Sequence, residues 1–203
     1  MKPVNRRWMP FWWLVPCLTM LLAAPVPAFQ PSGSGSYNGT SAVLPATGTI
    51  EVAFTPGDDA GKLIADAIDG AQREVLVQAF SFTHRKIADA LIAARNRGVD
   101  VKVIADPDQA DRIPTSVIAR MAKAKVPVFT DSEHTSAHNK VMIIDAGSSN
   151  AILVTGSFNF THAAQYKNAE NVLIFRGNQP LAETYLKNWH RHYKHSRPYR
   201  PKR

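Results

Sequence analysis

The alternation of short apolar runs with amphipathic stretches constrains the fold more than any other feature of the 203-residue sequence. Runs rich in Val and Ile predict strands, and apolar residues spaced every three or four positions predict helices. Between Ile50 and Asp131 these patterns alternate regularly, which favours parallel strands joined by right-handed helical crossovers. The strands expected in this half are "IEVAFT", "EVLVQAFSF", "VDVKVIAD" and "VPVFTD".

The second half follows a different pattern. The runs "HNKVMIID" and "AILVTG", joined by "AGSSN", predict a β-hairpin. A short helix "FTHAAQYK", a strand "ENVLIF" and the amphipathic helix "PLAETYLKNWHRHY" follow. The sequence therefore predicts a single α/β domain, with a mixed, largely parallel central sheet flanked by helices on both faces. The chain from Ile50 onward, about 155 residues, is long enough to bury one core.

The N-terminal segment reads as an export signal. Residues 1–28 contain a basic start, an apolar stretch and small residues that allow cleavage after Ala28. Three prolines interrupt the apolar stretch, so we expect no stable membrane insertion; a retained amphipathic anchor is the alternative. Cys17, the one cysteine, would leave with the signal, and disulfides would then be impossible. The expected location is the bacterial periplasm or the medium.

Charge and composition divide the rest of the chain. Residues 29–48 are rich in Gly, Ser and Pro and predict a flexible leader, residues 49–194 the catalytic domain, and residues 195–203 a basic tail. Of the 24 Lys and Arg residues, six lie in the last 13 positions, where there is no acid. The end of the chain is either a solvated solubility tail or an arm that docks nucleic acid. The docking residues would be Arg191, Lys194, Arg197 and Arg200.

The hairpin carries polar side chains where apolar residues would fold as well. His138 and Lys140 are two positions apart, so a strand places them on one face, with Asp145 on the other. Ser157 and Asn159 lie where the second strand turns toward a helix. Lys, Ser and Asn side chains and backbone N–H groups are all hydrogen-bond donors, which favours a tetrahedral oxyanion such as phosphate. Simple capping of the helix by Ser157 and Asn159 is the alternative.

An imidazole in a phosphate pocket has two chemical uses. It can attack phosphorus as a nucleophile, or it can donate a proton to a leaving alkoxide. A carboxylate on the other ring nitrogen would fix the tautomer. Glu170 is the candidate for that role, and an ordinary acid at the start of a strand is the alternative.

"HNKVMIID" followed by "GSFN" resembles the signature of the phospholipase D superfamily, which is His-x-Lys, an Asp, and then Gly-Ser-x-Asn. The resemblance extends from Glu51 to Arg191, and the chain resembles the small, secreted, single-motif bacterial endonucleases of that superfamily, the Nuc type. It implies the phospholipase D/nuclease fold and a covalent phosphohistidine intermediate. The stretch between the motif Asp and Gly is longer than usual in the family. The extra residues are even in number, so they should lengthen the hairpin without reversing its faces.

The resemblance also implies a role for each motif residue. His138 would be the nucleophile, or the general acid when it belongs to the other subunit. Lys140, Ser157 and Asn159 would bind the non-bridging phosphate oxygens, and Glu170 would orient His138. Asp145 would be a structural hydrogen-bond acceptor, and Gly156 the motif glycine.

In-line displacement at phosphorus needs a second imidazole, but the chain has one complete motif. His84 and Lys86 repeat the His-x-Lys spacing without a following Gly-Ser-x-Asn, and His134 lacks a matching Lys. We therefore expect a homodimer that shares one active site. No cofactor and no metal are expected. The histidines of "HRHYKH" (His190, His192 and His195) read as a solvated helix end, with adventitious transition-metal binding as the alternative.

Three function classes fit these features. The leading prediction is a metal-independent, low-specificity endonuclease that cleaves DNA or RNA, which the basic tail favours. A phospholipase D that removes phospholipid head groups uses the same chemistry, and the motifs do not separate the two. Near the site, Phe158, Phe160 and Tyr166 would stack on bases or meet acyl chains, although the two phenylalanines also suit the core. A non-catalytic phosphate-binding module is disfavoured, because it has no need for His138 with Glu170.

Overall fold

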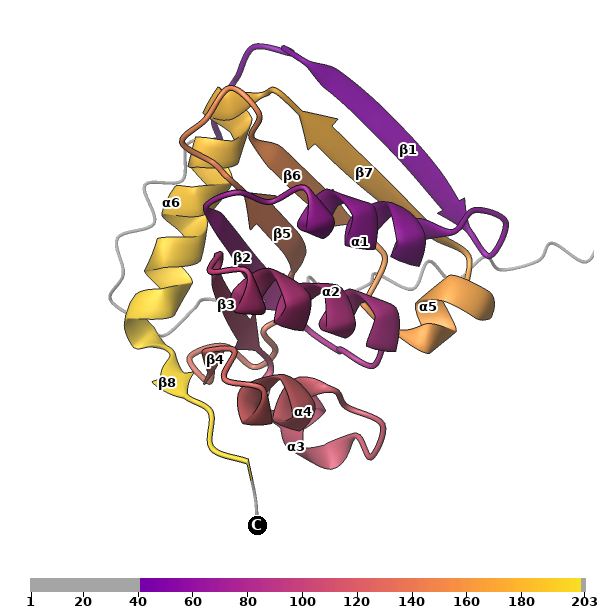
Figure 1. The fold of residues 1–203 in the computed structure, drawn as a ribbon, viewed down its shortest axis with the longest axis vertical. Coiled ribbons are helices and arrows are strands. Elements are labelled where there is room, and N and C mark those ends of the chain that lie inside the picture. The colour runs from indigo at the N-terminus through magenta and orange to yellow at the C-terminus, as the bar shows by residue number, and fades with distance from the viewer. Residues whose placement is uncertain (1–40, 202–203) are drawn as a thin grey trace, which may run out of the picture. The chain divides into compact units, whose positions relative to one another are not determined.

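A single mixed sheet of eight strands forms the centre of the fold, in the order β1-β7-β6-β5-β2-β3-β4-β8 (Figure 1). The computed structural model describes residues 41–201. The predicted signal sequence and most of the predicted leader therefore lie outside the described residues. The strands are β1 (Thr49–Thr55), β2 (Glu74–Ala79), β3 (Asp100–Ala105), β4 (Val128–Thr130), β5 (Lys140–Ile144), β6 (Ile152–Gly156), β7 (Glu170–Arg176) and β8 (Arg197–Pro198).

The prediction of a mixed α/β sheet is confirmed, but the sheet is less parallel than the alternation suggested. β2 pairs with β3, and β3 with β4, in parallel, as helical crossovers require. Every other pair of neighbours is antiparallel. The difference arises because the hairpin β5–β6 inserts beside β2 and because β1 pairs with β7, at the far edge, rather than with β2.

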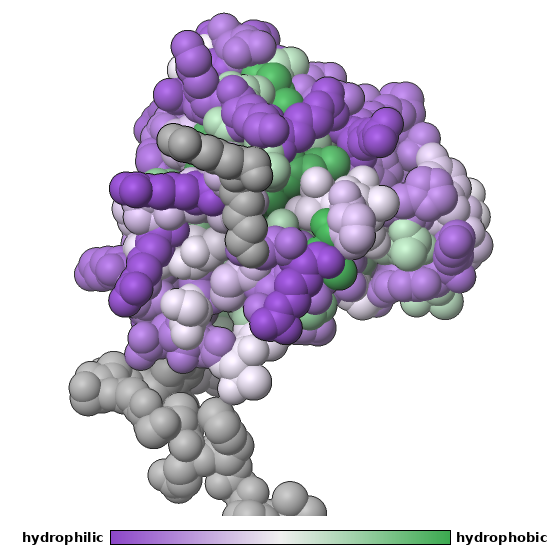
Figure 2. Space-filling model, turned by 90° about the horizontal axis from the view of Figure 1, so that it is seen from below, coloured by the Kyte–Doolittle hydropathy of each residue, from purple (hydrophilic) through white to green (hydrophobic). Residues whose placement is uncertain are grey.

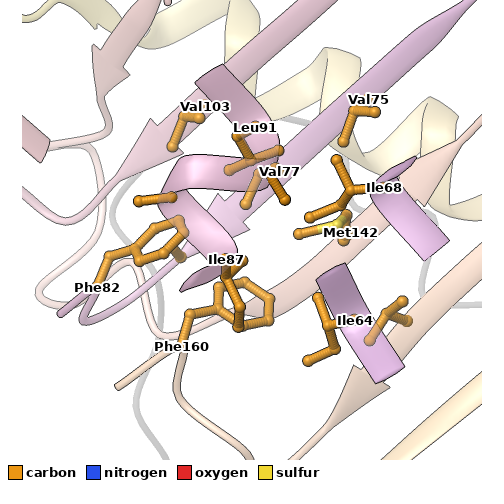
Figure 3. Packing of buried hydrophobic residues seen from close by; sticks show 14 of the residues in the cluster. Ile64, Ile68, Val75, Val77, Phe82, Ile87, Leu91, Val103, Met142 and Phe160 are labelled. Carbon is orange, nitrogen blue, oxygen red and sulfur yellow. The ribbon is translucent and has the colours of Figure 1, made fainter. Parts of the chain in front are cut away.

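Helices cover both faces of the sheet, as predicted. The helices are α1 (Ala60–Asp69), α2 (Arg85–Asn96), α3 (Pro107–Arg112), α4 (Ile118–Lys123), α5 (His162–Tyr166) and α6 (Gln179–His195). One buried cluster joins α1 and α2 to the sheet. Ile64 and Leu91 pack there with Met142 of β5 (Figure 3). The second cluster lies on the other face, where Trp189 of α6 is 1% exposed and donates a hydrogen bond from its ring N–H to the Val77 carbonyl, at 3.1 Å.

The predicted hairpin is present as β5 and β6, which pair in antiparallel fashion. Met142 pairs with Val154 and Ile144 with Ile152. The additional residues lie in the connection that spans residues 145–151, outside the paired strands. The alternation of side chains is therefore undisturbed, with Met142 in one core cluster and Ile143 in the other.

Two short elements were not predicted. α3 has the sequence "PDQADR", without apolar periodicity, and begins at Asp106, whose side chain accepts a hydrogen bond from the Gln109 N–H. β8 lies within the predicted basic tail and pairs with β4, and the Tyr199 N–H donates to the Val128 carbonyl at 2.8 Å. The first part of that tail therefore belongs to the sheet. Of the helices between residues 41 and 201, none has the length and apolarity needed to cross a membrane.

Candidate active site

Three strand ends bring the motif residues to one edge of the sheet. Lys140 begins β5, Gly156 ends β6 and Glu170 begins β7. Met142 pairs with Val154, and continuing this register by two residues puts Lys140 opposite Gly156. These ends point toward the lower side of the sheet in Figure 1. Figure 2 views the molecule from that side and shows mainly hydrophilic side chains around a hydrophobic strip.

His138 and Lys140 are in direct contact. The Lys140 Nζ atom lies 3.0 Å from His138 Nδ1 and 3.3 Å from Nε2, and it donates to the His138 carbonyl at 2.9 Å. The imidazole packs on the ring of Phe80, with 4.4 Å between centroids. Lys140 Nζ also lies 5.1 Å from the Phe80 centroid, within cation–π range. The Phe80 ring thus supports both polar groups.

The two members of this pair differ in exposure. His138 is exposed, whereas Lys140 is buried at 9% relative exposure. Burial lowers the pKa of the Lys140 ammonium, and the negative charge of Glu170 acts in the opposite direction. A cation held in a partly desolvated position interacts more strongly with an anion than the same cation in water does. An accessible imidazole beside a buried ammonium suits a phosphoryl group that arrives from solvent.

Ser157 is fixed by β7. Its hydroxyl donates to Glu170 Oε2 at 2.6 Å and accepts from the Asn171 N–H at 3.1 Å. The Ser157 and Phe158 N–H groups both donate to the Asn171 carbonyl, at 3.2 and 3.3 Å. The Ser157 oxygen is therefore held at the mouth of the site by two residues of one strand.

The Glu170 carboxylate makes no hydrogen bond to His138 among the described residues. It accepts instead from Ser157 and, through Oε1, from Asn168 Nδ2 at 3.0 Å. Ser157 directly follows β6, which pairs with β7, so its hydroxyl lies beside the start of β7 where Glu170 stands. The role of Glu170 in orienting His138 stays a prediction.

Asn159, two residues after Ser157, has no hydrogen-bond partner for its amide oxygen. Its Oδ1 atom is buried and makes no hydrogen bond among the described residues. Its backbone carbonyl accepts from the Thr161 N–H, and the Thr161 hydroxyl caps α5 by accepting from the Ala164 N–H. Thr161 rather than Ser157 or Asn159 caps this helix, so the simple capping alternative does not account for the pair.

The Asp145 carboxylate faces away from this cluster. Oδ1 accepts from the Arg73 and Glu74 N–H groups at 2.8 and 2.9 Å, and Oδ2 from the Gln72 N–H at 2.9 Å. It is 6% exposed and ties the end of β5 to the turn before β2. These hydrogen bonds explain why an aspartate is needed at this position of the motif, and they give it a structural rather than a chemical role.

Gly156 is required by close packing between strands. Its φ is +144°, and a Cβ there would lie 2.3 Å from the Asn171 carbonyl oxygen. A side chain would therefore push β6 away from β7 at the point where both carry site residues. The motif glycine acts by allowing this approach.

The remaining predicted residues fall into two groups. Phe158 and Phe160 are 2% and 1% exposed and belong to the core, whereas Tyr166 is 60% exposed. The basic residues assigned to docking are all exposed, the first two on α6 and the others at or after β8: Arg191, Lys194, Arg197 and Arg200. Phe80 was not predicted as a site residue, because it reads as one more apolar residue of the strand run "EVLVQAFSF".

A groove of about 540 Å³ lies close to the cluster but does not include His138 or Lys140. Its lining includes Lys86, His162, Tyr166 and Lys167. Lys167 directly precedes Asn168, which donates a hydrogen bond to Glu170, so one lining residue is a chain neighbour of the candidate site. Lysine side chains with an exposed tyrosine suit a polyanion that carries aromatic groups.

Comparison with known proteins gives consistent matches. The family model described as cardiolipin synthase, PLD-like domain, matches residues 64–193. A phospholipase D of Rickettsia conorii is 41% identical over 140 residues, which cover 69% of this chain and 67% of the relative. A mitochondrial cardiolipin hydrolase of Chlamydomonas reinhardtii is 34% identical over 117 residues, 58% of this chain and 50% of the relative.

A solved structure agrees with these matches. Nuc from Salmonella typhimurium, a phospholipase D family member, superposes with a TM-score of 0.70 and is 36% identical. The superposition covers 76% of this chain and 100% of Nuc. The chain belongs to the phospholipase D superfamily and is a single-motif hydrolase of the Nuc type.

Proposed function

We propose that the protein is an endonuclease that hydrolyses phosphodiester bonds through a covalent phosphohistidine on His138, with no metal ion in the reaction. The observation that carries the proposal is the contact between the exposed His138 ring and the buried Lys140 ammonium, at 3.0 Å. A nucleophile and an oxyanion-binding cation thus share one small pocket. Asn159 would donate to a non-bridging oxygen through its amide NH₂ group, and Ser157 would donate once its hydroxyl turns from Glu170 to the phosphate.

In the first step, a ring nitrogen of neutral His138 attacks phosphorus and forms a P–N bond as the P–O bond to the leaving group breaks. The leaving alkoxide takes a proton from an imidazolium on the opposite side. In the second step, that imidazole, now neutral, takes a proton from water. The resulting hydroxide attacks phosphorus, the P–N bond breaks, and His138 is released.

The opposite imidazole must come from a second chain. Of the other described histidines, His84 is 7% exposed with both ring nitrogens unpartnered, and none forms a hydrogen bond or ring contact with His138. We propose an isologous dimer in which the partner's His138 is the general acid. In this dimer each chain contributes one copy of the motif, so the shared site contains two copies although each chain carries one.

Nucleic acid is the favoured substrate because of the groove beside the site. Arg85, Lys86 and Lys167 line it together with Tyr166, and they outnumber the one lining acid, Asp59, which pairs with Lys86 at 3.7 Å. This excess of cations beside an exposed tyrosine matches a phosphate backbone with stacked bases better than a zwitterionic head group. Phospholipid is the second candidate, since the R. conorii relative is named phospholipase D. The chemistry at His138 is the same for both.

One incubation distinguishes the substrates. Purified protein is mixed in chelator with supercoiled plasmid and, separately, with phosphatidylcholine vesicles. We expect nicked plasmid and no free choline. Choline release alone would show that the protein is a phospholipase D rather than an endonuclease. Absence of product from both substrates, with folded protein, would refute the enzymatic proposal. His138→Ala is the inactive control, and His190→Ala, on the exposed face of α6, is the matched active control.

Export is part of the proposal. Cleavage after Ala28 in a bacterial host would place the enzyme in the periplasm or the medium. Intact-mass measurement of protein recovered from periplasmic extract should give the chain that begins at Phe29. Full-length protein held in the membrane fraction would instead indicate a retained anchor.

A further inference from the structure

Three imidazoles surround one buried carboxylate at the end of α6. Asp131 directly follows β4, and His134 lies three residues later in the loop toward β5. His192 and His195 are three apart on α6, so they share a face of the helix. One ligand atom from each of the four residues lies within 4.8 Å of all the others.

The distances converge on the carboxylate. Asp131 Oδ2 lies 2.7 Å from His192 Nδ1 and 3.4 Å from His134 Nδ1, and Oδ1 lies 3.2 Å from His195 Nε2. The ring centroids are 5.0, 5.4 and 5.5 Å apart, so the imidazoles form a nearly equilateral set. His195 Nε2 is buried, yet it makes no hydrogen bond of good geometry despite its distance from Asp131. Hydrogen bonding therefore leaves this cluster incomplete.

The charge of the buried Asp131 carboxylate also indicates that a positively charged partner is missing from the cluster. The Asp131 side chain is 0% exposed, and its ion-pairing partners among the described residues are these three histidines. A buried carboxylate that pairs with no lysine or arginine among the described residues needs another positive charge beside it. Neutral imidazoles do not compensate its charge, and three imidazolium ions this close would repel one another.

We propose that Asp131, His134, His192 and His195 bind one divalent transition-metal ion, with Zn²⁺ the best match. Nitrogen and carboxylate donors in fours are the usual tetrahedral set for Zn²⁺, whose bonds of about 2.0 Å place ligand atoms roughly 3.3 Å apart. The observed spacings need only small side-chain rotations to reach that value. His134, whose side chain is 47% exposed, gives the ion a route from solvent.

The ion would fasten the chain segment that leads to the catalytic histidine. His134 lies four residues before His138, and the Ala137 N–H between them is held by Asp106 Oδ2 at 3.0 Å. Two ligands come from this loop and two from α6, so the metal would cross-link elements that are distant in sequence. Four protein ligands leave no open position, which is typical of a structural site. The metal therefore takes no part in the phosphoryl transfer proposed above.

Binding is measured directly on untagged mature protein. The protein is stripped with chelator, dialysed, and titrated with Zn²⁺ by calorimetry, and Co²⁺ absorption reports the ligand geometry. We expect one ion per chain, intense tetrahedral Co²⁺ bands, and a rise in Tm of roughly 5–10 °C at a hundredfold excess of Zn²⁺ over Kd. His134→Ala and His195→Ala should each weaken binding at least about tenfold, whereas His190→Ala, on the same helix outside the cluster, should bind as wild type.

Absence of stoichiometric binding to folded wild-type protein would overturn the proposal. So would equal affinity in His134→Ala and His190→Ala. If His195→Ala fails to fold, the metal affinity of His134→Ala tests the proposal, because the exposed His134 ring can be removed without opening the core. Since the readout is metal binding, the result is independent of whether the protein cleaves nucleic acid.

Discussion

Removal of the Asp145 carboxylate should destabilise the fold without abolishing the chemistry. The carboxylate accepts three backbone N–H groups, at 2.8, 2.9 and 2.9 Å, and Asp145 has a positive φ of 50°. A hydrogen bond to a charged acceptor contributes about 1.5–3 kcal/mol, but Gln72 and Arg73 are exposed, so water replaces part of what is lost. Alanine also tolerates a positive φ poorly, at about 1 kcal/mol. We expect Asp145→Ala to lower the free energy of unfolding by about 3–4 kcal/mol.

Asp145→Asn separates geometry from charge. Its carbonyl can still accept from Arg73 and Glu74, whereas its NH₂ group faces the Gln72 N–H donor. Asparagine adopts positive φ readily, so the expected loss is smaller, about 1–2 kcal/mol. Urea denaturation at pH 7 measures both variants, with the m-value expected to stay unchanged. Asp69→Asn is the matched control, since its side chain is 61% exposed and its ion pair with Arg97 spans 3.8 Å; it should change stability by less than about 0.5 kcal/mol.

Plasmid nicking then tests the chemical part of the prediction. At a temperature where Asp145→Asn is folded, its rate should remain within about tenfold of wild type. His138→Ala should lose at least about a thousandfold. A folded Asp145→Asn as inactive as His138→Ala, or an Asp145→Ala with unchanged stability, would refute a purely structural role.

Three further outcomes follow from the site and its surroundings. Lys140→Met should reduce nicking at least about a hundredfold while leaving urea stability unchanged or higher. The reason is that it removes a buried ammonium for which no carboxylate between residues 41 and 201 lies at ion-pair distance; a loss of stability would contradict this. Gly156→Ala should lower the free energy of unfolding by about 2–4 kcal/mol, since its Cβ would meet the Asn171 carbonyl at 2.3 Å; an unchanged urea midpoint would count against it. Burial lowers the pKa of His84 below 6.5, so the unfolded state binds the proton more tightly. Stability should therefore fall as pH drops below about 6.5, less steeply in His84→Gln, and parallel pH profiles would show that His84 is not responsible.

The sequence predicted the elements and the motif side chains because both depend on local periodicity. The two-residue spacing of an extended chain places His138, just before β5, beside Lys140, the first residue of β5, whatever the neighbouring strands are. The position of Glu170 could not be predicted in this way. Whether its carboxylate contacts His138 or Ser157 depends on how closely β6 approaches β7 at Gly156, and periodicity along the chain does not report this distance. Phe80 was missed for the same reason, since its contact with His138 depends on the pairing of β2 with β5.

The cluster around Asp131 shows a second limit. The pattern "HRHYKH" reads as a solvated helix end, which is correct for the exposed His190 but wrong for His192, at 8% exposure. The partner of His192 lies 61 residues away along the chain. The pairing of β4 with β8, which helps to fix the end of α6 beside Asp131, involves two residues that carry no strand pattern. Elements as short as two residues show no repeating pattern, so their contacts cannot be predicted from periodicity.

The most direct test of the composite site uses heterodimers. Differently tagged wild-type and His138→Ala chains are co-expressed, and the mixed dimer is isolated by two affinity steps. With one shared site its nicking rate should fall below about 1% of the wild-type dimer, because either the nucleophile or the acid is always missing. A mixed dimer of wild type with His190→Ala should keep full activity. Half the wild-type rate in the His138→Ala heterodimer, or a fully active monomer, would contradict the account.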